Sequence, residues 1–187
     1  MITICFTGHR PNNKNLGGYN WNTPKNKQII EALKNQIIKT MDEANDNMFT
    51  FVCGGALGID QMAFSIVEDL RNTSAKAIFI ELASPFKEQY CKWNQSDRDR
   101  FQKQIKLADT VTYVDLLDKY NVDVYLPDIY YPAKMELRNH YMVDKSDIVI
   151  AVYDGSKKGG THNCVEYAKR MGKKIVIINP KEVWNEV

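Results

Sequence analysis

Residues 49–71 read FTFVCGGALGIDQMAFSIVEDLR, and this stretch carries three signals of one fold class. Residues 49–53 are an almost purely apolar run, which predicts a buried strand. Three glycines follow within five positions, and from residue 59 to residue 71 apolar side chains recur at helical spacing. A strand, a glycine-rich turn and a helix in this order predict a parallel α/β sheet with an anion-binding turn.

The same alternation runs along the whole chain. Strands are expected at residues 2–6, 49–53, 75–82, 110–114, 148–152 and 174–178, and helices at 24–44, 59–71, 86–108 with a break near Ser96, 132–145 and 160–171. Apolar strands that alternate with amphipathic helices indicate a parallel sheet covered on both faces. The sequence therefore predicts one α/β domain over residues 1–187: a Rossmann-like, doubly wound, mainly parallel sheet of about six strands.

Composition excludes several classes of protein. The net charge of +2 is too small for duplex DNA or an anionic membrane as the main partner. No C-x-x-C pair or zinc-ligand spacing is present among four cysteines and three histidines, so no metal site is expected. No cofactor is expected either. The chain starts directly with a strand and has no apolar run of membrane-spanning length. A cytoplasmic protein is the expectation.

Ligands of such sheets bind beyond the carboxyl ends of the strands, so the loops there hold the candidate residues. After the first strand, a turn suits close approach of backbone amides and an arginine suits a phosphate. After the third strand, an aromatic ring could stack on a base, although packing is the alternative. The candidates are Thr7, Gly8, His9 and Arg10 after the first strand and Pro85 and Phe86 after the third.

Two glycine-rich turns at helix starts are the strongest signals, because free amides and the helix dipole converge there. The first supplies Gly54, Gly55, Ala56, Gly58 and Asp60, and Asp60 is interpreted either as a helix cap or as a group that orients a ribose or base. The second supplies Asp154, Gly159, Gly160, Thr161 and Asn163. Neither is a Walker A or a G-x-G-x-x-G motif.

Arg138 and Asn139 are placed by topology. The helix at 132–145 leads into a strand, so it runs antiparallel to the strands and begins at their carboxyl ends. Arg138, in about its second turn, is therefore predicted to reach the ligand. Residues 116–131, just before this helix, are tyrosine-rich and irregular. They are predicted to fold over the pocket or to form a subunit interface of a homo-oligomer, with packing against the sheet as the alternative.

These motifs together resemble the SLOG superfamily. The turn at 53–60 resembles that of the DNA-processing protein DprA. The M-x-x-R helix at 135–138, the Ser-Asp strand entry at 146–147 and the loop at 159–166 resemble the LOG cytokinin-activating phosphoribohydrolases. Over nearly the whole chain, the T-G-H-R-P start, the K-W pair at 92–93, the R-N-x-x-M segment and the late Y-D-G and G-G-T resemble the DUF1273 group of YpsA- and YoqJ-like proteins of Firmicutes and their prophages.

The resemblance implies a small nucleotide-like ligand, such as an NAD or ADP-ribose derivative or a cyclic nucleotide, that is sensed or sequestered. If the chain is an enzyme, the resemblance implies an N-glycosidic hydrolase of a nucleoside monophosphate, with Arg138 and Glu166 as the catalytic residues. In the LOG loop, however, His162 replaces a glycine and Asn163 a threonine. Binding of single-stranded nucleic acid, through Lys157, Lys158 and aromatic side chains, is a third hypothesis. A role in protein–protein interaction also stays open.

Overall fold

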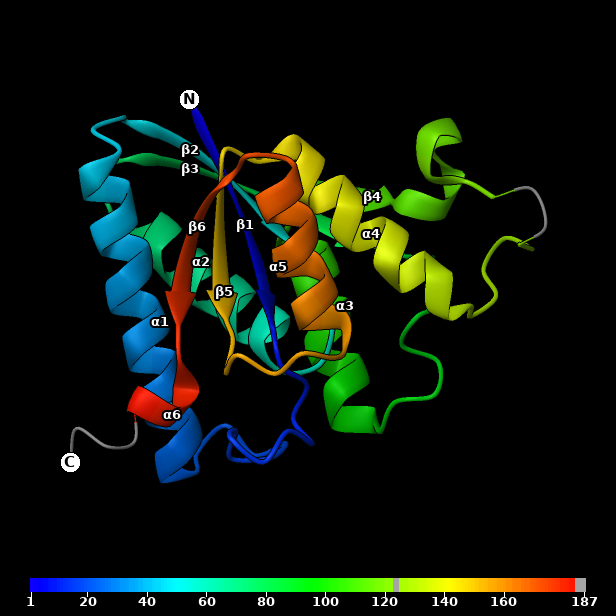
Figure 1. Ribbon diagram of the computed structural model, residues 1–187, viewed down its shortest axis with the longest axis horizontal. Coiled ribbons are helices and arrows are strands. Elements are labelled where there is room, and N and C mark those ends of the chain that lie inside the picture. The colour runs from blue at the N-terminus through cyan, green and yellow to red at the C-terminus, as the bar shows by residue number, and fades with distance from the viewer. Residues whose placement is uncertain (123–124, 184–187) are drawn as a thin grey trace.

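The computed structural model describes residues 1–122 and 125–183, which form one sheet of six parallel strands with helices on both faces (Figure 1). The strand order is β4-β3-β2-β1-β5-β6. The strands are β1 (Ile2–Gly8), β2 (Met48–Cys53), β3 (Ala77–Ser84), β4 (Thr110–Tyr113), β5 (Ile148–Val152) and β6 (Lys174–Ile178). The predicted single-domain, doubly wound α/β fold is confirmed.

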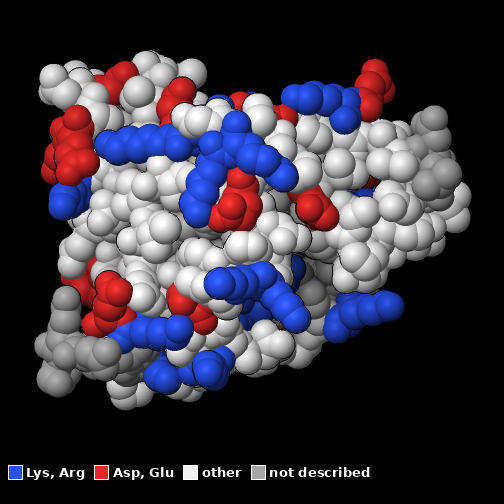
Figure 2. Space-filling model, in the orientation of Figure 1, with Lys and Arg blue, Asp and Glu red and all other residues white. Residues whose placement is uncertain are grey.

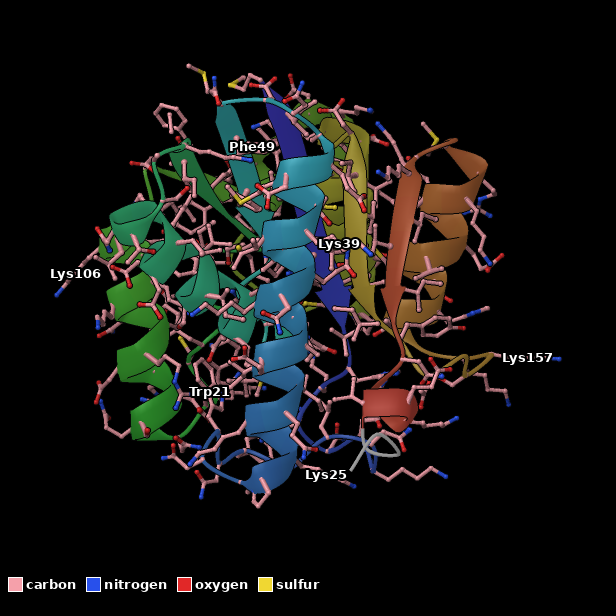
Figure 3. The ribbon with its side chains drawn as sticks, turned by 90° about the vertical axis from the view of Figure 1, so that its left-hand side faces the viewer. Trp21, Lys25, Lys39, Phe49, Lys106 and Lys157 are labelled. Carbon is pink, nitrogen blue, oxygen red and sulfur yellow. The ribbon has the colours of Figure 1, made fainter. Side chains whose placement is uncertain are left out.

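Two apolar layers separate the sheet from its helices. The helices are α1 (Pro24–Glu43), α2 (Ile59–Thr73), α3 (Gln95–Leu107), α4 (Pro132–Lys145), α5 (Gly160–Arg170) and α6 (Pro180–Val183), with short 3₁₀ helices η1 (Val114–Leu116) and η2 (Asp118–Tyr120). Side chains from α1, α2 and α3 share one buried cluster with the sheet, whereas α4 and α5 supply another. Figure 3 shows α1 crossing the first of these faces.

Local sequence explains where helices α1 and α3 begin. Thr23 caps α1, since its hydroxyl accepts a hydrogen bond from the Asn26 N–H at 3.3 Å, and Pro24 occupies the first turn. Asn94 caps α3 in the same way, accepting from the Asp97 N–H at 3.0 Å. The Asn94 cap marks the break that was expected near Ser96.

Several predicted boundaries are wrong. β1 runs on to Gly8, and β3 covers 77–84 rather than 75–82. Most importantly, residues 86–93 were predicted to be helical but form turns. The side chain of Arg98 donates to the carbonyl oxygens of Cys91 at 2.6 Å and Trp93 at 2.7 Å, and so stabilises this compact turn segment from within α3. The short helix α6 was not predicted.

Helix α4 is fastened to the rest of the fold by three cation–carboxylate pairs. Its Lys134 pairs with Asp115, its Arg138 with Asp60 and its Lys145 with Glu81. The three acids come from η1, from the start of α2 and from β3. Charged contacts as well as apolar packing therefore set the position of α4 over the sheet.

On the face drawn in Figure 2, basic and acidic side chains are interspersed in the upper part, whereas basic ones predominate toward the lower right. Within residues 1–122 and 125–183, no helix is both long and apolar enough to span a bilayer.

Candidate functional site

The loop after β1 is divided between a buried part and an exposed part. Thr7 and Gly8 belong to the strand itself, and a Cβ on Gly8 would lie 2.5 Å from the Cβ of Ile59, so only glycine fits there. His9 is buried, and its Nε2 lies 3.0 Å from an Asp154 carboxylate oxygen. Arg10 is exposed. Of these four predicted ligand residues, the structure leaves Arg10 most accessible.

Asp154 ties the loops after β1 and β5 together. Its backbone N–H donates to Nε2 of His9 at 3.2 Å, and its carboxylate accepts hydrogen bonds from the Asn15 side chain at 2.6 Å and the Ser156 N–H at 3.0 Å. Burial would raise the pKa of Asp154, but the hydrogen bonds from Ser156, the nearby His9 and the bond from Asn15 together hold its pKa below the usual range. The ionised carboxylate of Asp154 therefore links the loop after β5 to the loop after β1.

The first glycine turn is buried rather than open. A Cβ on Gly54 would lie 1.6 Å from Nη1 of Arg138, and Gly55 has a φ of +67° that favours glycine. A Cβ on Gly58 would lie 2.7 Å from the His9 carbonyl oxygen. The turn is closed by Asp60, whose carboxylate accepts from the Ala56 N–H at 3.3 Å. The helix-cap interpretation of Asp60 is wrong: the N-cap of α2 is Gly58, no side chain caps it, and Asp60 lies in the first turn of the helix.

Arg138 meets this turn from α4, as the topology predicted. Its Nη1 lies 2.9 Å from Oδ2 of Asp60, and both side chains are buried. The neighbouring Asn139 is partly exposed on the same helix. Glu166, in contrast, forms an ion pair with Lys169 on the surface of α5 at 2.7 Å. In the described structure, the predicted catalytic pair Arg138 and Glu166 is not brought into contact.

The second glycine turn is open. Nothing lies within 4 Å of a Cβ added to Gly159 or Gly160, and no side chain caps the start of α5. Its first backbone N–H groups therefore lack intrahelical partners, as at any helix start. Thr161 is partly exposed and Asn163 is exposed, whereas His162 lies 2.9 Å from the Tyr153 hydroxyl. Lys157 extends outward from this loop in Figure 3.

A cavity of about 740 Å³ opens at the same edge of the sheet, and is called the carboxyl-edge cavity below. Arg10 contributes from the β1 loop, Phe86 and Trp93 from the turn segment after β3, and Tyr130 from the segment before α4. Its remaining lining residues are Glu88, Gln89, Cys91, Lys92, Asp128, Ile129 and Met135. Pro85 is buried just below, where its carbonyl oxygen accepts from the Asp115 N–H at 3.3 Å.

Segment 116–131 was predicted to lie over the pocket or at an interface, and its last residues do line the carboxyl-edge cavity. Asp128 accepts a hydrogen bond from the Lys87 N–H at 3.2 Å, which joins the segment to the turn after β3. The ring of Tyr130 meets that of Phe86 edge-on at 6.4 Å. Residues 123 and 124 lie outside the described structure. Closure over a ligand and a subunit interface both stay predictions.

Sequence reasoning gave little weight to part of this wall. Lys92 and Trp93 entered the sequence analysis only as the K-W pair at 92–93 within a predicted helix, and Gln89 was not singled out. The signal that could have found them is the Asn94 cap, which excludes residues 86–93 from the helix. No cluster of three or more potential metal ligands occurs in the described part of the chain.

Comparison with known proteins gives the same assignment throughout. A model described as the YspA SLOG family matches residues 4–183. The SPbeta prophage-derived protein YoqJ of Bacillus subtilis is 38% identical over 160 residues, which cover 83% of this chain and 92% of YoqJ. A UPF0398 protein of Halalkalibacterium halodurans is 28% identical over 170 residues, covering 91% and 82% of the two chains. A UPF0398 protein of Bacillus cereus is 27% identical over 173 residues, covering 92% and 85%. The chain therefore belongs to the YspA SLOG family.

Proposed function

We propose that the chain binds a small nucleotide or nucleotide-derived ligand in the carboxyl-edge cavity and acts by sensing or sequestering it. The observation that carries the proposal is the composition of the cavity wall, where the guanidinium of Arg10 shares one space with the exposed ring of Tyr130 and the partly buried ring of Trp93. Phe86 is 3% exposed and packs edge-on against Tyr130. A guanidinium suits phosphate, and aromatic rings suit the faces of a base. The volume of about 740 Å³ lies within the range of small-ligand sites.

The uncapped start of α5 supports the proposal from the adjacent strand. β1 and β5 are hydrogen-bonded neighbours, so the loops that follow them lie at one edge, and Asp154 joins these loops through His9. Free N–H groups at a helix start favour anions. A ligand with more than one anionic group could therefore use both Arg10 and the start of α5.

Sensing is favoured over hydrolysis by the placement of the acids. Glu166 is paired with Lys169 at the surface, and Asp60 is neutralised by Arg138. The carboxylates that line the cavity are engaged as well, since Glu88 accepts from the Cys91 thiol at 2.7 Å and Asp128 accepts from the Lys87 N–H at 3.2 Å. A hydrolase would need a carboxylate that is free to act beside the bound ribose. Incubation with nucleoside monophosphates and chromatography for released base separates these functions, because a sensing protein releases none.

Cysteine labelling provides a direct test of occupancy. Cys91 is exposed and lines the carboxyl-edge cavity, whereas Cys5, Cys53 and Cys164 are buried. The hydrogen bond with Glu88 raises the pKa of Cys91, so alkylation should be run at alkaline pH. We expect NAD, ADP-ribose, cyclic nucleotides or AMP to slow alkylation of Cys91 and to raise the melting temperature, with Cys91→Ser as the labelling control.

The role of Arg10 is tested with the same ligands. Arg10→Gln should lower the affinity for the ligand that protects Cys91 by roughly 10- to 100-fold, as expected for loss of a hydrogen bond to a charged group. Absence of protection and of thermal shift with every compound would reject the proposed function. Protection that survives Arg10→Gln unchanged would reject this site assignment.

A further inference from the structure

Arg138 is held by the protein itself. Its side chain is only 4% exposed, and its Nη1 donates to Asp60 Oδ2 at 2.9 Å. The same carboxylate oxygen accepts from the Ala56 N–H. Arg138, Asp60 and Ala56 thus form a chain of contacts that joins α4 to the backbone of the first glycine turn.

The guanidinium also lies directly against the turn. A Cβ on Gly54 would lie 1.6 Å from Nη1 and 2.5 Å from Cζ of Arg138, so the group occupies the space that glycine leaves. Its Nε is buried and has no hydrogen-bond partner among the described residues. Packing of this kind fixes a guanidinium in place and leaves it little freedom to follow a ligand.

The turn that Arg138 holds lies beside the wall of the carboxyl-edge cavity. A Cβ on Gly55 would lie 3.2 Å from Nε2 of Gln89, which lines the cavity. Arg10 is placed differently, because it is exposed and lines the cavity itself. The two arginines of this edge thus differ in accessibility: Arg138 is buried and paired with Asp60, whereas Arg10 has exposed side-chain surface, although burial of part of its side chain lowers its pKa.

We infer that Arg138 is a positioning residue, which acts on the ligand through Asp60 and the glycine turn, while Arg10 is the cation that contacts the anionic group of the ligand. The part of this inference that concerns Arg10 rests on the proposed function. The role of Arg138 in holding the first glycine turn can be tested without a ligand.

The first measurement uses AMP and adenosine as probes, which differ only by the phosphate. Arg10→Gln should weaken AMP by about 10- to 100-fold and leave adenosine nearly unchanged, because only the phosphate contact is lost. Arg138→Gln should lower the affinity for AMP and the affinity for adenosine by the same factor. The matched control is Arg170→Gln, at the exposed end of α5, which should change neither. Loss of AMP binding alone in Arg138→Gln would overturn the inference.

The second measurement is hydrogen exchange at the Ala56 amide. Arg138→Gln should speed this exchange by at least about 10-fold, since the Asp60 carboxylate loses the partner that orients it. If Arg138→Gln is too unstable to study, the double variant Arg138→Gln with Asp60→Asn takes its place, because it leaves no unpaired buried charge. It should show the same increase in the exchange rate of the Ala56 amide. Exchange at the wild-type rate in both would overturn the positioning role. If neither AMP nor adenosine binds the wild type, the ligand part fails, and the exchange rate still decides the role of Arg138.

Discussion

The ammonium of Lys134 lies 2.8 Å from Oδ2 of Asp115, and each of these side chains is only 4% exposed. The same ammonium donates to the carbonyl oxygen of Leu126 at 2.7 Å. One buried cation thus joins α4, η1 and the segment that lines the carboxyl-edge cavity. Buried pairs of this kind are costly to break, because the partner that remains keeps an uncompensated charge.

Lys134→Met should therefore lower the free energy of unfolding by about 3–5 kcal/mol. Adding Asp115→Asn should restore part of that loss, because it removes the orphaned charge. Urea denaturation of the wild type, the single variant and the double variant gives the values. The matched control is Lys39→Met, because Lys39 is exposed and lies 3.9 Å from Glu43; its effect should stay below about 1 kcal/mol. Equal effects at Lys134 and Lys39 would contradict the assignment.

Gly54→Ala should be poorly tolerated, because the new methyl group would overlap the guanidinium of Arg138. We expect a loss of about 1–3 kcal/mol or more in the free energy of unfolding, together with faster exchange of the turn amides. Gly160→Ala is the matched control, since nothing lies within 4 Å of its Cβ position. Thermal and urea unfolding compare the two, and a tolerated Gly54→Ala would show that Arg138 is free to move.

Asp154 should contribute to stability in a pH-dependent way. Its pKa is lower in the folded protein than in the unfolded chain, where it is near 3.9. The contribution is therefore present above about pH 4 and is lost as the pH falls toward the folded pKa. Asp154→Asn should be less stable at neutral pH and should lose less stability between about pH 5 and about pH 2.5 than wild type. The control is Asp118→Asn on the exposed 3₁₀ helix η2, and a wild-type pH profile in Asp154→Asn would refute the prediction.

Asp128 should restrain the segment that lines the cavity. Its carboxylate accepts from the Lys87 N–H, and its φ of +59° is one that aspartate tolerates better than most residues. Asp128→Ala removes the bond and retains the unfavourable φ, so the segment should separate more often from the turn after β3. The rate of Cys91 alkylation should then rise in the absence of ligand, with Asp118→Ala as the comparison. An unchanged rate would show that Asp128 does not control access.

The strand and helix pattern was predictable because apolar periodicity is a local property of the chain. The run at 148–152 and the proline-initiated helix at 132–145 were placed at their observed bounds. Residues 86–93 were not, because the contacts from Arg98 to the Cys91 and Trp93 carbonyls that stabilise their turns have no signature in apolar periodicity. A polar stretch next to a helix is predicted to be helical from its sequence pattern unless such contacts are known.

The site shows the same division. Topology correctly placed Arg138 near the first glycine turn, since the direction of α4 follows from the order of the elements. Its pairing with Asp60, 78 positions away, was not predicted, because both Arg138 and Arg10 were expected to contact the ligand and the sequence does not show which of them is buried. Burial decides between the two arginines, and burial depends on the packing of the whole fold.

The three cation–carboxylate pairs of α4 also define the register of that helix. A shift by one residue would translate α4 by about 1.5 Å and rotate it by about 100°. Lys134, Arg138 and Lys145 would then all leave their acids at once, and three buried carboxylates would lose their counter-charges. Apolar contacts alone tolerate small slides, whereas these pairs do not. Helix α4, which bounds the cavity, is thus restricted to one position on the sheet. Its other residues can vary as long as the spacing of these three charges is kept.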